Sequence, residues 1–245
     1  MRYAVSSRIG DRANNEDALG VKIDNKRSCF VLCDGVGGHR FGDVASSLVK
    51  DIILEDFTHY KKDDFIDYTI QHAQDVLTYR KQVDHAYDDM MTTLVVLVID
   101  GPYAQYAHIG DSRLYRFEGE QIIERTIDHS VAQMLVLTGD LKERQIRRSP
   151  DRSTLLKAMG MEWDHTSYEK SERFVWNAST SFLLCSDGFW EPLHEKVMMK
   201  TMKKHNCKEW LDHMNACIEK KIRKSKNADN YSAIVVKMGE NAYEM

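Results

Sequence analysis

Single carboxylates stand directly after short apolar segments of this chain. The clearest case is CFVLCDGVGGH over residues 29–39, where an apolar run ends in Asp34-Gly35. The same arrangement recurs in FLLCSDG over 182–188, which ends in Asp187-Gly188. An Asp-Gly pair most often only closes a turn. Its repetition beside further isolated acids indicates a site in which a carboxylate lies at the mouth of a buried strand.

The remaining acids of this kind also lie next to predicted strand ends or tight turns. They are Glu16 and Asp17 in RANNEDA, Asp111 in IGDSR and Asp229 in NADN. Strand ends gather at common edges of packed sheets, so a shared pocket is geometrically possible. Carboxylates at short range cannot all remain ionised unless cations neutralise them. Oxygen donors without His or Cys favour Mg²⁺ or Mn²⁺, although a helix cap or a turn would explain any one of these acids alone.

Alternating strand and helix patterns must position these acids. Short strands are predicted within residues 2–33, most clearly over 21–23 and 29–33, because the apolar runs are short. Apolar residues at helical spacing predict two successive helices, over 44–57 and 66–77. A meander of strands then runs from 92 to 127 with turns near Gly101-Pro102 and 118–120, which implies antiparallel pairing.

The second half of the chain repeats this order. A helix is predicted from near His129 to a C-terminal cap at Gly139, followed by an exposed, mobile excursion over 140–153. Strands are predicted over 172–176 and 180–185, then a helix over 210–222 and a last strand over 232–236. Runs of strands followed by helices favour antiparallel sheets covered by helices over repeated βαβ units.

Composition narrows the class of protein. The 245 residues and only 3 prolines predict one compact domain, residues 1–245. A net charge of −4 argues against a general nucleic-acid binder. The chain shows no apolar run long enough to cross a membrane and no signal peptide, so we expect a cytoplasmic protein that does not engage membranes. An odd count of 5 cysteines without a CxxC pair excludes a disulfide framework, and Cys29, Cys33 and Cys185 are predicted to be buried.

These motifs together carry a resemblance. The sequence resembles the bacterial form of the metal-dependent serine/threonine protein phosphatases of type 2C, in the motif order Arg12-x-x-x-Glu16-Asp17, Asp34-Gly35-x-Gly37-Gly38-His39, Thr92-Thr93, Gly110-Asp111-Ser112-Arg113, Ser186-Asp187-Gly188 and Asp229-Asn230. The likeness spans almost the whole chain. It implies an α+β fold, a four-layer αββα sandwich of two antiparallel β-sheets flanked by α-helices, which agrees with the patterns above.

The resemblance also implies roles for individual residues. Asp34 would bridge two Mn²⁺ or Mg²⁺ ions, with the Gly35 carbonyl on one of them and Asp187 and Asp229 on the other. Arg12 would bind the substrate phosphate through its planar fork. A hydroxide that bridges the two ions would then attack the phosphorus of phosphoserine or phosphothreonine.

Further residues take less defined roles in the resemblance. Glu16 and Asp17 would serve the second ion directly or through water, and the division between them stays open. Asp111 resembles the ligand of a third metal ion.

The implied partners are phosphorylated proteins and a cognate serine/threonine kinase, and the enzyme is expected to be a monomer.

Some positions depart from the family pattern. Val36 occupies the place where eukaryotic relatives carry a histidine proposed as the general acid. His39 is a candidate for that role, and a structural role in the glycine turn is equally compatible with its position. The segment from Gly139 to Ser153 resembles the flap beside the active site, with Ser149-Pro150 in place of the usual His-Pro.

Three other functions compete with this interpretation. Cys217 and Arg223 have the spacing of a cysteine-based phosphatase, but they fall within a helical pattern whose N–H groups are already bonded. A metal-dependent nuclease would need a basic groove. A catalytically silent module that binds phosphoproteins would be indicated by a missing acid, whereas Arg12, Asp34, Asp187 and Asp229 are all present.

Overall fold

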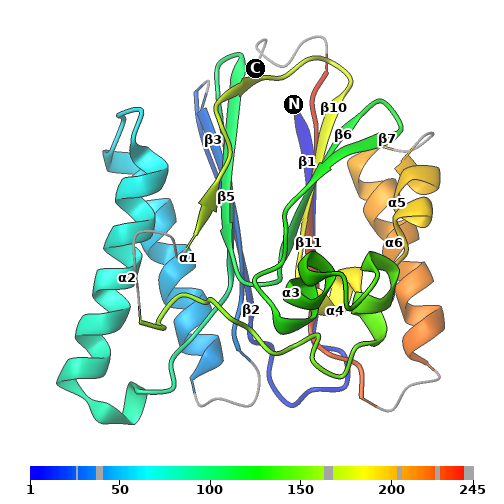
Figure 1. The fold of residues 1–245 in the computed structure, drawn as a ribbon. Coiled ribbons are helices and arrows are strands. Elements are labelled where there is room, and N and C mark those ends of the chain that lie inside the picture. The colour runs from blue at the N-terminus through cyan, green and yellow to red at the C-terminus, as the bar shows by residue number, and fades with distance from the viewer. Residues whose placement is uncertain (26, 37–40, 163–167, 203–205, 224–226, 240–245) are drawn as a thin grey trace.

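Two antiparallel sheets form the centre of the fold, which we describe from a computed structural model (Figure 1). The structure describes residues 1–25, 27–36, 41–162, 168–202, 206–223 and 227–239. The first sheet has the order β1 (Arg2–Arg8), β11 (Tyr231–Lys237), β10 (Thr180–Cys185), β6 (Arg113–Glu118) and β7 (Gln121–Arg125). The second has the order β2 (Asp17–Asp24), β3 (Arg27–Asp34), β4 (Leu94–Asp100), β5 (Tyr103–Ile109) and β8 (Glu169–Lys170), and β9 (Phe174–Val175) also pairs with β5.

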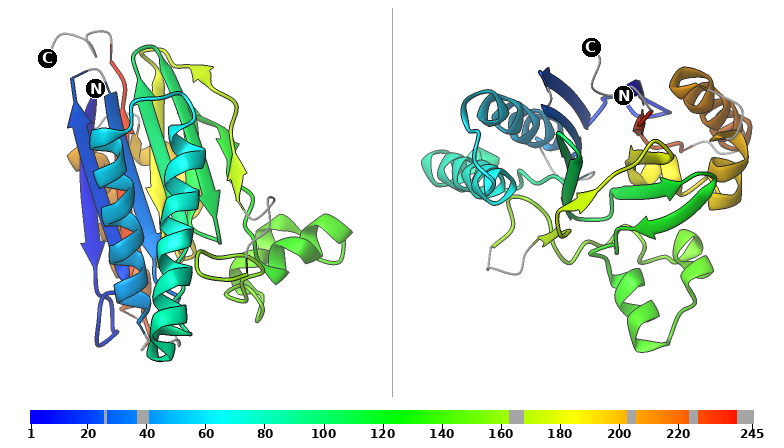
Figure 2. Two further views of the ribbon diagram at one scale, coloured as in Figure 1. Left: turned by 90° about the vertical axis from the view of Figure 1, so that its left-hand side faces the viewer. Right: turned by 90° about the horizontal axis from the view of Figure 1, so that it is seen from above.

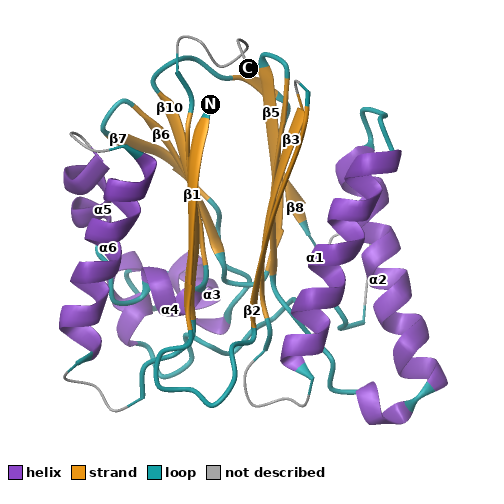
Figure 3. Cartoon of the chain, turned by 180° about the vertical axis from the view of Figure 1, so that it is seen from behind, coloured by secondary structure: helices purple, strands orange, loops and turns teal. Residues whose placement is uncertain are grey.

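Helices cover the outer face of each sheet, as Figures 2 and 3 show. The long helices α1 (Gly42–His59) and α2 (Phe65–Val83) lie side by side on the second sheet. The outer face of the first sheet is covered by α4 (Asp187–Trp190), α5 (Glu195–Met202) and α6 (Cys207–Ile222). The remaining short elements are η1 (His85–Tyr87), α3 (Val131–Thr138) and η2 (Glu143–Arg148). This arrangement confirms the predicted four-layer sandwich.

The β3 strand shows why the apolar runs become central strands. Phe30 and Leu32 point into the core between the sheets, whereas Cys29, Val31 and Cys33 face α1 and α2. All five side chains are completely buried, because both faces of this strand are covered. The prediction that Cys29, Cys33 and Cys185 act as buried apolar residues is confirmed. The apolar run 29–33 ends where β3 itself ends, at Asp34.

The segment after α3 differs from its prediction. Gly139 ends α3 with φ +88°, as the sequence indicated, and the helix begins close to the predicted His129, after Ser130, which caps it by accepting from Gln133 N. The sequence predicts an exposed excursion over 140–153, but this segment contains η2, whose Ile146 is 1% exposed in the hydrophobic core of the first sheet and its helices. The expectation of exposure is wrong for this residue, since a single apolar anchor leaves no periodicity in the sequence.

Within the described residues, no helix combines the length and the apolar character that a membrane span requires.

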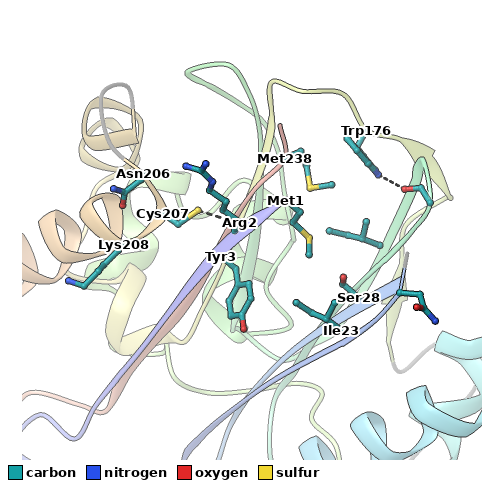
Figure 4. Close-up of a pocket in the computed structure, with 13 residues that line it drawn as sticks. Met1, Arg2, Tyr3, Ile23, Ser28, Trp176, Asn206, Cys207, Lys208 and Met238 are labelled. Atoms are coloured by element: carbon teal, nitrogen blue, oxygen red, sulfur yellow. Dashed lines mark hydrogen bonds between the residues drawn. The ribbon is translucent and has the colours of Figure 1, made fainter. Parts of the chain in front are cut away.

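The two ends of the sandwich differ in character. Near both termini, a pocket of about 450 Å³ is lined by Met1, Tyr3, Trp176 and Met238 among others (Figure 4). None of the predicted site residues lines this pocket. They meet at the opposite end of the strands.

Candidate active site

The predicted acids converge at one end of the sandwich. Asp17 begins β2 and Asp34 ends β3, while Asp187 begins α4 directly after β10. A cavity of about 720 Å³ lies at these ends, and its lining extends to Asp229 and Asn230, directly before β11. Its lining includes seven of the predicted site residues, namely Arg12, Glu16, Asp34, Gly35, Asp111, Asp187 and Asp229. His39, together with Gly37 and Gly38, lies outside the described residues.

Asp17 and Asp34 are direct cross-strand partners in the β2–β3 pair. The Asp34 backbone is fixed on its other side by Thr93, whose N–H donates to Asp34 O at 2.8 Å and whose Oγ1 accepts from Asp34 N at 3.0 Å. The Ser186 hydroxyl donates to Asp17 Oδ2 at 3.0 Å, while the buried Asp17 Oδ1 has no hydrogen-bond partner. The backbones are therefore fixed, and carboxylate oxygens remain available for a ligand.

Gly35 allows two backbone segments to approach each other closely. A Cβ at this position would lie 2.4 Å from both the carbonyl carbon and the oxygen of Gly42, the first residue of α1. The Gly35 N–H donates to Glu16 O at 3.0 Å, which joins the end of β3 to the loop before β2. Glycine is thus required here by the packing of α1, whether or not its carbonyl binds a ligand.

Asn230 holds the loop that carries Arg12 and Glu16 against the start of β11. Its Oδ1 accepts from Glu16 N at 2.9 Å, and its Nδ2 donates to the carbonyl oxygens of Ile9 and Asn14. Asn230 belongs to the Asp229-Asn230 motif, which assigns it no role by itself. Its contacts identify it as a positioning residue, which the Asp-Asn dipeptide alone did not reveal.

Arg113 supports the loop that carries Asp111, a role that its place in the Gly110-Asp111-Ser112-Arg113 motif does not assign. Its guanidinium forms a bidentate ion pair with Asp128 at 2.7 and 2.6 Å, and both side chains are at most 2% exposed. The central carbon of this guanidinium, Cζ, lies 3.3 Å from the centre of the Trp190 ring. Trp190 Nε1 in turn donates to the Asp111 carbonyl at 2.9 Å. Only the tertiary structure identifies Asp128 as the partner.

The electrostatics of the cavity favour bound cations. Burial, and then the charges of neighbouring carboxylates, raise the pKa values of Asp34 and Asp187 well above the ordinary value. Burial, and next the charge of Asp128, raise the pKa of Asp111 to about 7. Burial raises the pKa of Asp17 to about 6. Burial and nearby acids raise the pKa of Glu16 as well. A divalent cation would relieve the cost of keeping these groups ionised.

The donor set fits hard divalent cations. Every candidate ligand is an oxygen, and the unpartnered Asp17 Oδ1 supplies a buried acceptor that no protein donor satisfies. Arg12 Nη2 donates to Asp229 Oδ2 at 2.6 Å, so this candidate ligand already contacts a cationic group. Among the described residues, a second group of metal-binding side chain types is formed by His108, His129 and Glu169, whose three donor atoms lie within 4.8 Å of one another.

That histidine group is held by hydrogen bonds that disfavour metal binding. Gly110 N donates to His129 Nδ1 at 3.2 Å, which leaves the ring proton on Nε2, the atom 3.4 Å from Glu169 Oε1. His108 Nε2 contacts Ile127 O at 2.8 Å, and the two rings stack with centres 4.7 Å apart. Burial lowers the pKa of each histidine to about 4, so both are neutral at pH 7. The pair supports the turn before Asp111.

A family comparison agrees with this geometry. The model of the family described as protein phosphatase 2C matches residues 6–226 of the chain. The chain belongs to the protein phosphatase 2C family. This membership confirms the family predicted from the motifs and the enzyme class, a protein phosphatase that binds divalent metal ions.

Individual relatives of this phosphatase 2C chain are bacterial. The serine/threonine phosphatase Stp of Listeria innocua is 29% identical over 202 residues, which cover 78% of this chain and 79% of the relative. The crystal structure of the Mycobacterium tuberculosis serine/threonine phosphatase PstP/Ppp matches with a TM-score of 0.84 and 26% identity, over 98% of this chain and 99% of the other. A structure of the PstP catalytic domain in complex with two manganese ions matches with a TM-score of 0.80, 25% identity and 98% coverage of both chains.

The structure also bears on the competing cysteine mechanism. Cys217 lies within α6 and Arg223 caps the C-terminal end of this helix, so their spacing does not form a phosphate-binding loop. Burial raises the pKa values of Cys29, Cys33 and Cys185, which leaves these thiols protonated. None of these four cysteines lines the carboxylate cavity.

Proposed function

We propose that this phosphatase hydrolyses phosphoserine and phosphothreonine in proteins with the help of two Mn²⁺ or Mg²⁺ ions. The observation that carries the proposal is the convergence of Asp34, Asp187, Asp229 and Arg12 on one cavity. The names of the Listeria and mycobacterial relatives support the serine/threonine specificity, and the manganese complex of PstP supports the metal.

Each acid takes a role in holding the ions. Asp34 would contact both ions, the Gly35 carbonyl one of them, and Asp187 and Asp229 the other. Asp17 and Glu16 complete the second site directly or through water, and Asp111 would bind a third, weaker ion. When bound, these cations supply an activated water as the nucleophile and offset the negative charge that develops on the phosphoryl group.

The chain's own side chains position the substrate. Arg12 is half-exposed at the edge of the cavity, so its fork can turn from Asp229 to two phosphate oxygens. The fixed backbones of Asp34 and Asp17 keep the carboxylates in place, which lowers the cost of organising the site during the reaction. His39 remains a candidate for protonating the leaving group, together with water.

Further expectations belong to the same proposal. We propose that residues 1–245 form a single phosphatase domain, with residues 139–153 as its flap, and that the enzyme acts as a cytoplasmic monomer against a cognate serine/threonine kinase. The competing silent module receives no support from the sequence, because each acid that would bind the two ions is present.

A phosphopeptide assay tests the proposal. The purified protein should release phosphate from a phosphothreonine peptide in the presence of Mn²⁺ and stop when the metal is chelated. Adding Mn²⁺ back should restore the rate. Activity that survives complete chelation would contradict the metal mechanism, and a well-folded protein that binds Mn²⁺ without turnover would favour the silent module.

A further inference from the structure

A basic groove adjoins the carboxylate cavity. It has a volume of about 850 Å³ and is lined by Lys142, Arg144 and Arg148 around η2, His194, and Lys221 near the end of α6. Arg147, Glu191, Pro192 and Lys221 line both the groove and the cavity. The two depressions therefore share one wall, and an extended ligand bound in the cavity could continue into the groove.

The acids of this region are already paired with other arginines. Glu191 accepts from Arg152 at 2.9 Å, and Glu195 pairs with Arg147. Glu143, within η2 itself, pairs with Arg125 at 2.5 Å. Glu191, the one of these acids that lines the groove, is therefore already paired with an arginine outside the groove lining.

Within the described residues, four cations of the groove, including Lys221, form no ion pair with a carboxylate. Lys142, Arg144 and Arg148 are exposed and form no ion pair within the part of the chain that the structure describes. Lys221 donates to the Pro192 carbonyl at 2.5 Å, which holds its charge at the shared wall. This local positive excess stands against a net charge of −4 for the whole chain. Solvated surface cations are common, but here they converge on one concave surface beside the reaction site.

The segment that carries these cations is anchored from below. Ile146 is buried in the hydrophobic core of the first sheet and its helices, and Arg147 donates to the carbonyl oxygens of Trp190 and Glu191. Arg144 and Arg148 flank these anchors in sequence and line the groove. A backbone that is already fixed loses less conformational entropy when a ligand binds.

We propose that this groove binds acidic residues of the substrate protein that flank the phosphorylated serine or threonine. The inference rests on the proposed function and extends it, because it assigns a class of substrate: phosphoproteins with Asp or Glu next to the phosphosite. The charge complementarity and the shared wall together favour this occupant over a ligand that does not enter the cavity. Exposed charge pairs act mainly through substrate affinity, and salt screens them.

Steady-state kinetics on matched peptides test the inference. One phosphothreonine peptide carries acidic flanks on one side, a second carries them on the other side, and a third is neutral. The parent enzyme should show a KM about fivefold lower for at least one acidic peptide, and added salt should reduce this preference. The double variant Arg144→Ala/Arg148→Ala should lose the preference with kcat unchanged. The double variant Lys22→Ala/Lys200→Ala removes two exposed charges that do not line the groove, and it should keep the preference.

Hydrolysis of p-nitrophenyl phosphate separates the two proposals. This small substrate cannot reach the groove while it reacts in the cavity, so both double variants should hydrolyse it like the parent. An enzyme that hydrolyses neither substrate would contradict the proposed function itself. Normal p-nitrophenyl phosphate turnover without any preference for acidic peptides would overturn the groove assignment alone. Tighter binding of a duplex oligonucleotide by the parent than by the arginine variant, again without a peptide preference, would assign the groove to nucleic acid instead.

Discussion

Arg12 Nη2 donates to Asp229 Oδ2 at 2.6 Å, which joins the candidate phosphate-binding cation to a candidate metal ligand. Both side chains are partly exposed, at 50% and 41%, so water screens the pair and its contribution to stability is small. A metal ion at Asp229 and a phosphate at Arg12 would each compete with this contact. The pair therefore couples the two binding events at the edge of the cavity.

Replacing Arg12 separates phosphate binding from metal binding. We expect Arg12→Ala to lower kcat/KM for a phosphopeptide by about 10- to 100-fold, because a charge-assisted bond to phosphate is lost. The Mn²⁺ concentration that gives half-maximal activity should not rise, since Asp229 loses a competing cation. Arg12→Lys keeps the charge without the planar fork and should recover only part of the rate. Kinetics identical to those of the parent would show that Arg12 does not contact the phosphate.

Replacing Asp34 or Asp187 should lower the turnover of the enzyme and raise the stability of its metal-free form. Asp34→Asn and Asp187→Asn remove buried charges that repel their neighbours, so we expect each to lower turnover by about 100-fold or more. Without metal, each variant should unfold at a higher temperature, by about 2–4 °C for each kcal/mol gained. Thermal unfolding with and without Mn²⁺ measures both effects. Near-normal turnover, or a metal-free variant less stable than the parent, would indicate that these acids are not the repelling ligands.

The stability that Mn²⁺ adds should increase with pH. The pKa values of Asp17, about 6, and Asp111, about 7, are raised above their unfolded value near 3.8. The metal-free folded state therefore binds more protons than the unfolded state between about pH 4 and 7, and it loses stability as the pH rises through that range. Cations compete with these protons. Unfolding temperatures at pH 5.5 and pH 8 should show the larger Mn²⁺-dependent increase at pH 8, and an equal increase at both would contradict this linkage.

A methyl group at Gly35 should disturb the junction between β3 and α1. Because the new Cβ would lie 2.4 Å from Gly42 backbone atoms, Gly35→Ala should lower the free energy of unfolding by about 1–3 kcal/mol and reduce turnover. Gly239→Ala is the matched control, since nothing lies within 4 Å of its added Cβ. Urea denaturation of both variants measures the difference. Equal stability would show that α1 can shift without cost.

The buried Arg113–Asp128 pair should be far more important than an exposed one. Asp128→Asn leaves the Arg113 guanidinium buried without its partner charge, so we expect a loss of about 3–5 kcal/mol in the free energy of unfolding. Asp212→Asn breaks the exposed Lys208–Asp212 pair and should cost at most about 1 kcal/mol. Equal losses in the two variants would mean that Trp190 and Tyr115 hold Arg113 without help from Asp128.

Much of the fold followed from local patterns. The run CFVLC is apolar at every position, which requires cover on both faces. In the structure, one face packs in the core between the two sheets and the other packs against α1 and α2. Helical spacing located α1, α2 and α6, and α3 begins close to His129 and ends at Gly139 as expected. The short α4 and α5 went unpredicted, because a four-residue helix has no period and the polar α5 buries few residues. Contacts made by other parts of the chain determine such elements.

The sequence by itself determined the types of ligand and their order along the chain: oxygen donors at strand ends, an arginine near the N-terminus and glycines where backbones meet. Only the tertiary structure decided the pairings. Arg12 pairs with Asp229, 217 residues away in the sequence. Arg113 pairs with Asp128, and Arg147, which lines the groove, pairs with Glu195. The physical reason is that a charged side chain has no preferred partner within its own segment. Its partner is selected when the packed sheets and helices bring distant segments together and exclude water between them.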